Sequence, residues 1–135
     1  MRYVKSCGFV AYKKVNNKNY YLIIQTINGD FGFPKGHMEK DESEIETAIR
    51  ELKEETNIDV EVLDGFRIQI EYKMPNMIDV MKQSVYFLGR CITDDIICQE
   101  NEVFFAKFMS YYEAIEVLTF EETKLILQEA EKYIC

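Results

Sequence analysis

Three glutamates stand close together in the segment 36–58. Glu54 and Glu55 follow Glu51 by three and four positions, so on a helix the three side chains share one flank, with Cβ atoms about 5–6 Å apart. Like charges so placed repel, and one adjacent cation, Arg50, leaves an excess of negative charge. Hard divalent cations such as Mg²⁺ take carboxylate and phosphate oxygens as ligands. The pattern therefore indicates a metal site, with a merely solvated acidic helix face as the alternative.

A helix must hold these glutamates in place. Ser43 followed by Glu46 is a capping box, in which side chain and backbone satisfy each other's free donors, so Ser43 is the expected N-cap. Asn57, after the expected C-terminus, tolerates the left-handed backbone wanted there. Apolar positions with helical spacing form a stripe about 100° wide for docking on a core: Ile45, Ala48, Ile49, Leu52 and Thr56.

The spacing of residues across 36–58 resembles the Nudix box, the loop–helix–loop signature of the Nudix hydrolases. These enzymes cleave a nucleoside diphosphate linked to another moiety. Every charged position of the box matches, and Asn57 stands where the family usually has glycine. The resemblance implies an α/β (α+β) Nudix fold, an α/β/α sandwich around a mixed β-sheet, with residues 1–135 as one domain.

The same resemblance gives roles to the box residues. It implies that Glu51, Glu54 and Glu55 bind Mg²⁺ or Mn²⁺ and that the Gly36 carbonyl adds a ligand. Arg50 would then act in catalysis by orienting Glu51.

Two glutamates outside the helix complete the implied site. Glu42 would hold Arg50, as outer residues do around many metals. Glu102 begins the last expected strand, where many Nudix enzymes have a metal-binding or basic glutamate, although Glu100 is only two residues away. Either Glu54 or Glu102 would accept a proton from the attacking water.

The segment 31–42, FGFPKGHMEKDE, is similar to the box entry of the asymmetric diadenosine tetraphosphate hydrolases. Flanking similarities extend this resemblance over nearly the whole chain. It implies Mg²⁺-dependent hydrolysis of dinucleoside polyphosphates, with diadenosine tetraphosphate giving ATP and AMP. The alternatives are an RNA 5′-triphosphate pyrophosphohydrolase, a (d)NTP pyrophosphatase, and a non-catalytic nucleotide-binding module. The last typically loses box glutamates, and this chain keeps them.

Five residues are candidates for binding the substrate, each with an ordinary structural alternative. Lys35 can place a point charge on a phosphate, or it is a solvated loop lysine. His37 suits a phosphate hydrogen bond or an acid role, or it is structural. Lys82, expected at the end of a loop, contacts the polyphosphate or is a surface lysine. Tyr72 and Tyr86 suit adenine stacking or phosphate hydrogen bonds, but strand aromatics are commonly core residues.

The composition narrows the class of protein. A chain of 135 residues is long enough for one well-packed domain. Its net charge of −8 argues against a broad nucleic-acid surface, and a bound divalent metal would make the acidic site attractive to phosphates. Because the sequence has no apolar run of signal or membrane-spanning length, a cytoplasmic protein is expected, and its four cysteines are expected to be reduced. The resemblance implies a small-molecule nucleotide as the substrate, and the protein is expected to be a monomer or a homodimer.

The remaining elements follow from alternation, turn residues and caps. Gly65 is expected to separate two strands, and Pro75 and Asn76 to end the second. Capping boxes at Ser110 with Glu113 and Thr119 with Glu122 would open two C-terminal helices. The expected strands span residues 3–12, 20–27, 59–63, 66–74, 84–92 and 102–109, with a turn at 15–19, a loop up to Lys82 and an acidic connection at 93–101.

Overall fold

A computed structural model describes residues 1–73 and 77–135, and in these residues seven strands form one mixed sheet. The strands are β1 (Arg2–Val15), β2 (Lys18–Thr26), β3 (Phe31–Gly32), β4 (Lys35–His37), β5 (Val60–Lys73), β6 (Val80–Cys91) and β7 (Val103–Ser110). Their order is β3-β2-β1-β6-β5, with β4 paired to β1 and β7 paired to β2. β1 and β6 run parallel, whereas the other pairs are antiparallel.

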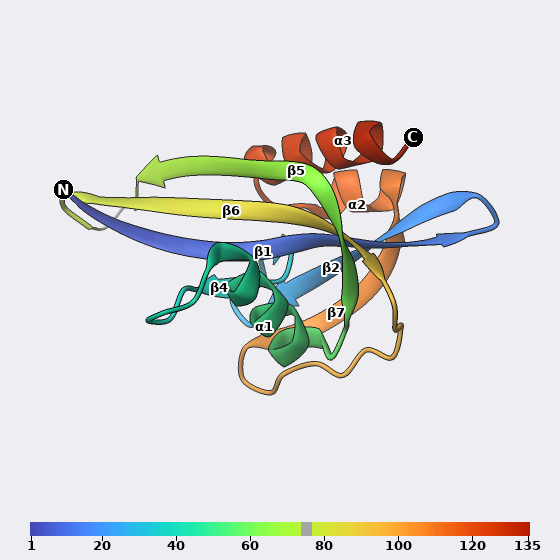
Figure 1. Cartoon of the computed structure of the whole chain (residues 1–135), viewed down its shortest axis with the longest axis horizontal. Helices are drawn as coiled ribbons and strands as arrows, with labels where there is room; N and C mark the ends of the chain where they lie inside the picture. Colours follow the sequence, from blue (N-terminus) through green and yellow to red (C-terminus); the bar gives the residue numbers. More distant parts are fainter. Residues whose placement is uncertain (74–76) are drawn as a thin grey trace.

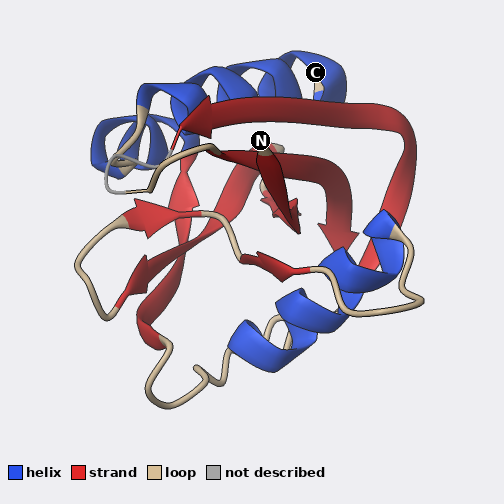
Figure 2. Ribbon diagram, turned by 90° about the vertical axis from the view of Figure 1, so that its left-hand side faces the viewer, coloured by secondary structure: helices blue, strands red, loops and turns tan. Residues whose placement is uncertain are grey.

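Helices cover both faces of this sheet. α1 (Glu44–Thr56) lies on one face, and α2 (Tyr111–Val117) and α3 (Glu121–Ile134) lie on the other (Figures 1 and 2). Alternate residues of β1 supply the two cores, because successive strand side chains point to opposite faces. Val10 and Tyr12 pack with α2 and α3, while Phe9 and Ala11 pack with α1. The predicted α/β/α sandwich is confirmed.

The caps of α1 agree with the sequence prediction. Ser43 and Glu46 form the reciprocal capping box, and Asn57 has the left-handed conformation, with φ 68° and ψ 12°. The buried face of α1 is rotated about the helix axis relative to the predicted stripe. Ile49 is 45% exposed and Glu55 is buried, because α1 packs against β4 as well as β1.

One bent strand replaces the two predicted around Gly65. Gly65 has a φ of +88°, and the pairing with β6 shifts between Val62 and Arg67, so β5 continues through a bulge. The Tyr133 hydroxyl donates to the Asp64 carbonyl and fastens α3 to this bulge. The predicted strand end at Met74, Pro75 and Asn76 lies outside the described residues.

Two further predictions were wrong in detail. Thr119 does not cap a helix, since α3 follows Phe120 and the Thr119 hydroxyl instead accepts a hydrogen bond from the Phe31 backbone at 2.7 Å. Lys82 lies within β6 and not in a loop, because β6 extends to Val80 by pairing with the first residues of β1. Ser110 does cap α2, accepting from the Glu113 backbone.

Two whole-chain expectations can be compared with the structure. All four cysteines, which lie within the described residues, are free thiols. Among the helices of residues 1–73 and 77–135, none is long and apolar enough to cross a membrane.

An ion-pair network fastens the start of α1 to the sheet. Glu44 accepts from Lys5 of β1 at 2.8 Å and from two nitrogens of Arg67 of β5, both at 2.9 Å. Hydrogen bonds from Arg67, followed by those from Lys5, lower the pKa of Glu44 to about 2, against the effect of partial burial. The first turn of the glutamate-bearing helix is therefore held from two strands.

Replacing Glu44 with Gln should lower the free energy of unfolding at neutral pH by about 1 kcal/mol. A carboxylate that binds two partly exposed cations contributes more to stability than a single surface ion pair does. The folded pKa of Glu44 is about 2, below an unfolded value of roughly 4.3. Its stabilisation is therefore complete above the unfolded value and is lost as pH falls towards 2. Urea unfolding at pH 7 and pH 2.5 measures both effects.

Glu121→Gln is the matched control, because Glu121 also lies in the first turn of a helix but is highly exposed, with Lys124 3.7 Å away. An equal loss of unfolding free energy in the two variants would contradict the role of the network. So would a loss in the Glu44→Gln variant that is as large at pH 2.5 as at pH 7.

Candidate active site

The guanidinium of Arg50 is the centre of a cluster of carboxylates. It donates to Glu42 at 2.6 and 3.0 Å, to Glu51 at 2.9 Å and to Glu54 at 3.2 and 3.3 Å. It also donates to the backbone carbonyl of His37 at 3.0 Å. One cation therefore makes hydrogen bonds to three carboxylates, with the Glu39 carboxylate a further 3.7 Å away, and the box residues named from the sequence do come together.

Glu42 is the best satisfied of these carboxylates. Besides Arg50, it accepts from the Thr47 hydroxyl at 2.8 Å and from the Glu39 backbone at 2.9 Å. The hydrogen bond from Arg50, followed by that from the Glu39 backbone, lowers the pKa of Glu42 to about 2. Glu42 is thus a fixed anion that orients Arg50. Thr47, which the sequence analysis did not single out, supports it one turn into α1.

Gly36 is needed where β4 passes Glu51. A Cβ at position 36 would overlap the Glu51 carboxylate, so any other residue would displace that side chain. β4 is held there because Gly36 pairs with Cys7 of β1. The glycine of the box therefore allows the backbone and the Glu51 carboxylate to approach each other closely.

Glu55 is the most unusual member of the cluster. It is 6% exposed, and its Oε2 atom is buried without a hydrogen-bond partner. Burial, followed by a hydrogen bond and negative charge from Glu51 and the charges of Glu102 and Glu54, raises the pKa of Glu55 to about 9. A buried carboxylate without a cation is costly and calls for a positively charged partner.

The donor set of this cluster fits a hard divalent metal. It offers only oxygen ligands, an excess of negative charge, a buried carboxylate oxygen without a partner and a carbonyl-bearing glycine in contact with Glu51. In the described parts of the chain, no three acidic, histidine or cysteine side chains already surround one point. The carboxylates of Glu51 and Glu54 both accept hydrogen bonds from Nη1 of Arg50.

The connection between β6 and β7 brings Glu102 towards this cluster. Glu102 directly precedes β7, and its charge is among those that raise the pKa of Glu55. Backbone hydrogen bonds join this connection to the end of α1, from Gln99 to the Glu55 carbonyl at 3.1 Å and from Ile97 to the Thr56 carbonyl at 3.0 Å. Glu102 is therefore within electrostatic reach of Glu55.

A second group of polar side chains surrounds Lys35. Its ammonium donates to the Ser84 hydroxyl at 3.2 Å and to the Tyr72 hydroxyl at 3.4 Å, and it lies 6.0 Å from the Tyr86 ring centroid. Burial lowers the pKa of Lys35. Ser84 is fully buried and was missed by the sequence analysis. A small hydroxyl within the apolar strand sequence SVYFLG was its only signal.

Tyr72 shares this positive environment. Burial alone would raise its pKa, but the charge of Lys35, a hydrogen bond with Ser84 and the charge of Lys82 outweigh burial and lower the pKa. Lys82 pairs with Tyr72 across β5 and β6, so the structure brings Tyr72, Lys82 and Lys35 together.

For Tyr86 the structure favours the core alternative, and for His37 it leaves the imidazole exposed. Tyr86 is 1% exposed, with its ring against Phe33, so it presents no free face for an adenine. It is a core residue beneath Lys35, because its place in β6 faces the core that α2 and α3 cover. His37 is exposed, and the interaction seen at its position is made by its backbone carbonyl, which accepts from Arg50.

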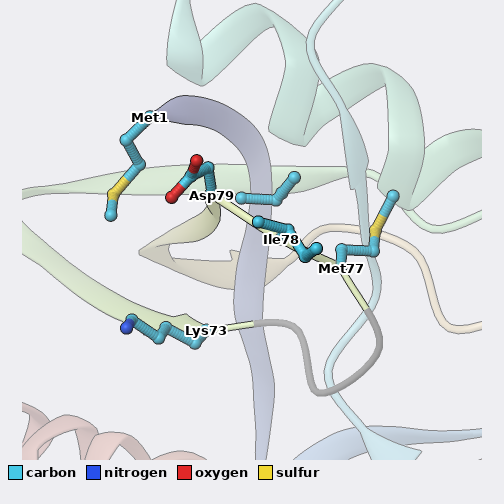
Figure 3. Close-up of a pocket in the computed structure, with 6 residues that line it drawn as sticks. Met1, Lys73, Met77, Ile78 and Asp79 are labelled. Carbon is cyan, nitrogen blue, oxygen red and sulfur yellow. The ribbon is translucent and has the colours of Figure 1, made fainter.

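A hollow of about 240 Å³ lies beyond the Tyr72–Lys82 pair (Figure 3). It is lined by Met1, Lys73, Met77, Ile78, Asp79 and Val80. Val80 pairs with Arg2, which is five residues from Cys7, the partner of Gly36. At about 3.3 Å per residue, the hollow is therefore roughly 16 Å along β1 from the glutamate cluster. It does not belong to the Arg50 cluster.

Comparison with known proteins agrees with this geometry. The family described as the NUDIX domain matches residues 8–129. Over 98% of its length, this chain is 31% identical to the bis(5′-nucleosyl)-tetraphosphatase [asymmetrical] of Rattus norvegicus, covering 96% of that protein. A Caenorhabditis elegans protein of the same name is 28% identical, with 97% of this chain and 96% of that protein covered.

Solved structures give the same result. The C. elegans Ap4A hydrolase, in a binary complex, superposes with a TM-score of 0.87 at 26% identity, and 97% of each chain is covered. The NUDIX domain of Shewanella oneidensis NrtR, complexed with ADP ribose, superposes with a TM-score of 0.78 at 15% identity, which shows the fold alone. This superposition covers 100% of the present chain and 90% of the NrtR chain. With the box cluster and the fold in agreement with these matches, the chain belongs to the Nudix family and is a Nudix hydrolase.

Proposed function

We propose that this chain hydrolyses dinucleoside polyphosphates, with diadenosine tetraphosphate and water giving ATP and AMP. The observation that carries the proposal is similarity over nearly the whole length to proteins named asymmetrical bis(5′-nucleosyl)-tetraphosphatases. Such a match includes the residues around Lys35 as well as the glutamate helix. The four free thiols fit the cytoplasmic setting expected from the sequence.

Glu51, Glu54, Glu55, Glu102 and the Gly36 carbonyl would hold Mg²⁺ or Mn²⁺ in this proposal. Bound divalent metal lowers the pKa of a water molecule and offsets the charge that develops on an attacked phosphoryl group. Glu55 would contribute the oxygen that is buried without a partner.

The side chains themselves have separate tasks. Arg50, fixed by Glu42, keeps Glu51 oriented through the 2.9 Å hydrogen bond. Glu54 is the most exposed of the three helix glutamates and is suited to accept the proton of the attacking water, with Glu102 as the other candidate base.

Lys35, Tyr72 and Lys82 would bind the polyphosphate. Two ammonium groups and a hydroxyl of lowered pKa provide charge-assisted hydrogen bonds to anionic oxygens. Tyr72 also offers a partly open ring for an adenine. Tyr86 supports Lys35 from the core, and the exposed imidazole of His37 is available to a phosphate.

Product analysis tests the substrate. Purified protein with Mg²⁺ should convert diadenosine tetraphosphate to equal amounts of ATP and AMP, resolved by anion-exchange chromatography. Parallel reactions contain dNTPs and 5′-triphosphate RNA. Pyrophosphate and a nucleoside monophosphate formed faster from dNTPs, or pyrophosphate released faster from RNA, would replace the proposed substrate. Failure to cleave any of them, with the fold intact by circular dichroism, would favour a binding module.

The Glu54→Gln variant tests the catalytic helix. Its kcat for diadenosine tetraphosphate should fall by about 10²–10⁴-fold, the usual contribution of a positioned proton acceptor. Folding should be nearly unaffected, because Glu54 is exposed and lies off the buried stripe. Steady-state kinetics and a thermal melt measure the two effects.

Glu129→Gln in α3 is the control for the loss of one surface carboxylate. Glu129 is exposed and lies 3.5 Å from Lys132 on its own helix. Its kcat should match that of the parent. A Glu54→Gln enzyme with parental kcat would remove Glu54 from the mechanism.

A further inference from the structure

The connection between β6 and β7 is bonded along the end of α1. Its backbone supplies donors to helix carbonyls that otherwise lack partners, Ile97 to Thr56 at 3.0 Å and Gln99 to Glu55 at 3.1 Å. The Val103 backbone in turn donates to Gln99 at 3.1 Å. Gln99 therefore joins the end of α1, through its N–H, to the first residue of β7, through its carbonyl.

Asn57 adds a side-chain bond to this junction. Its backbone is left-handed and its N–H donates to the Lys53 carbonyl at 2.9 Å, which closes the helix. Its side-chain Nδ2 donates to the Asp95 carbonyl at 3.1 Å, across to the connection. Glycine would adopt the same backbone without strain. The side-chain amide therefore makes a hydrogen bond that ending the helix does not require.

This bond bears on the placement of Glu102. Between Asp95 and Val103 the connection has no regular secondary structure, so its path depends on such point contacts. Glu102 lies three residues beyond Gln99, the residue bonded to the Glu55 carbonyl. A contact that fixes the start of this segment limits how far Glu102 can move relative to the glutamates of α1.

We propose that Asn57 is a positioning residue, whose side-chain bond to Asp95 holds the 95–102 segment against the end of α1 and thereby sets the distance between Glu102 and the helix glutamates. The proposal rests on the role proposed for Glu102 in hydrolysis. Asn57 is not one of the residues proposed to bind metal or substrate, so its effect should appear in kcat and not in KM.

The Asn57→Gly variant separates the side-chain bond from the backbone requirement. In protein without added metal, hydrogen exchange followed by NMR should show faster exchange of the Ile97 and Gln99 amides, with a melting temperature near that of the parent. Asn17→Gly is the matched control. Asn17 is also left-handed, with a φ of 65°, but it lies in the turn between β1 and β2, so those two amides should keep their protection.

Kinetics with Mg²⁺ and diadenosine tetraphosphate complete the experiment. Asn57→Gly should lower kcat by about two- to tenfold, the range expected when one hydrogen bond is lost, with KM unchanged. The same change made in a Glu102→Gln background should have no further effect on kcat, because both substitutions act on one group. Asn17→Gly should retain parental kcat and KM.

Three results would overturn the proposal: unchanged exchange at Ile97 and Gln99, unchanged kcat, or an equal loss of kcat in the Glu102→Gln background. A Glu102→Gln enzyme as active as the parent would refute the role of Glu102, and with it the catalytic purpose of Asn57. The exchange measurement would still decide separately whether Asn57 fastens the segment.

Discussion

The repulsion among carboxylates on α1 is the constraint on which the site depends. Arg50 faces Glu42, Glu51 and Glu54 at hydrogen-bonding distance, and Glu55 is buried behind them with an oxygen that lacks a partner. One guanidinium cannot neutralise this group. Placing so much negative charge on one helix is unfavourable for folding unless a cation binds there, so the cluster is best explained by the metal chemistry of the Nudix family.

The rest of the fold keeps these groups together. The capping box starts α1 at Ser43, and Lys5 and Arg67 hold its first turn through Glu44. At the other end, the left-handed Asn57 closes the helix and meets the connection that carries Glu102. Between these ends, β4 pairs with β1 so that a glycine passes the Glu51 carboxylate. The glutamates are thus fixed by contacts at both ends of one helix and by a neighbouring strand.

Local patterns in the sequence were enough to predict the helix and its caps, because the positions that share a helix flank follow from its period alone. The resemblance to the Nudix box, and not the local pattern, pointed to Glu42 and Gly36, which the structure brings together with Arg50 and Glu51. Features set by distant segments were not predictable in this way. The burial of Glu55 depends on how α1 rotates against β4, and Thr119 bonds to Phe31 from far along the chain. The burial of Tyr86 and Ser84 was not predictable for the same reason, since the helices that cover a sheet decide which face of a strand becomes buried.

Metal binding is the most direct test of this explanation. Titrating Mn²⁺ into the protein by calorimetry, with and without the product ATP, should show uptake by the parent. Uptake should be lost when Glu51, Glu54 and Glu55 are all replaced by Gln. Because that replacement also removes the repulsion, the metal-free triple variant should be at least as stable as the parent. No uptake by the parent under either condition, or equal uptake by the triple variant, would contradict a metal site built from these glutamates.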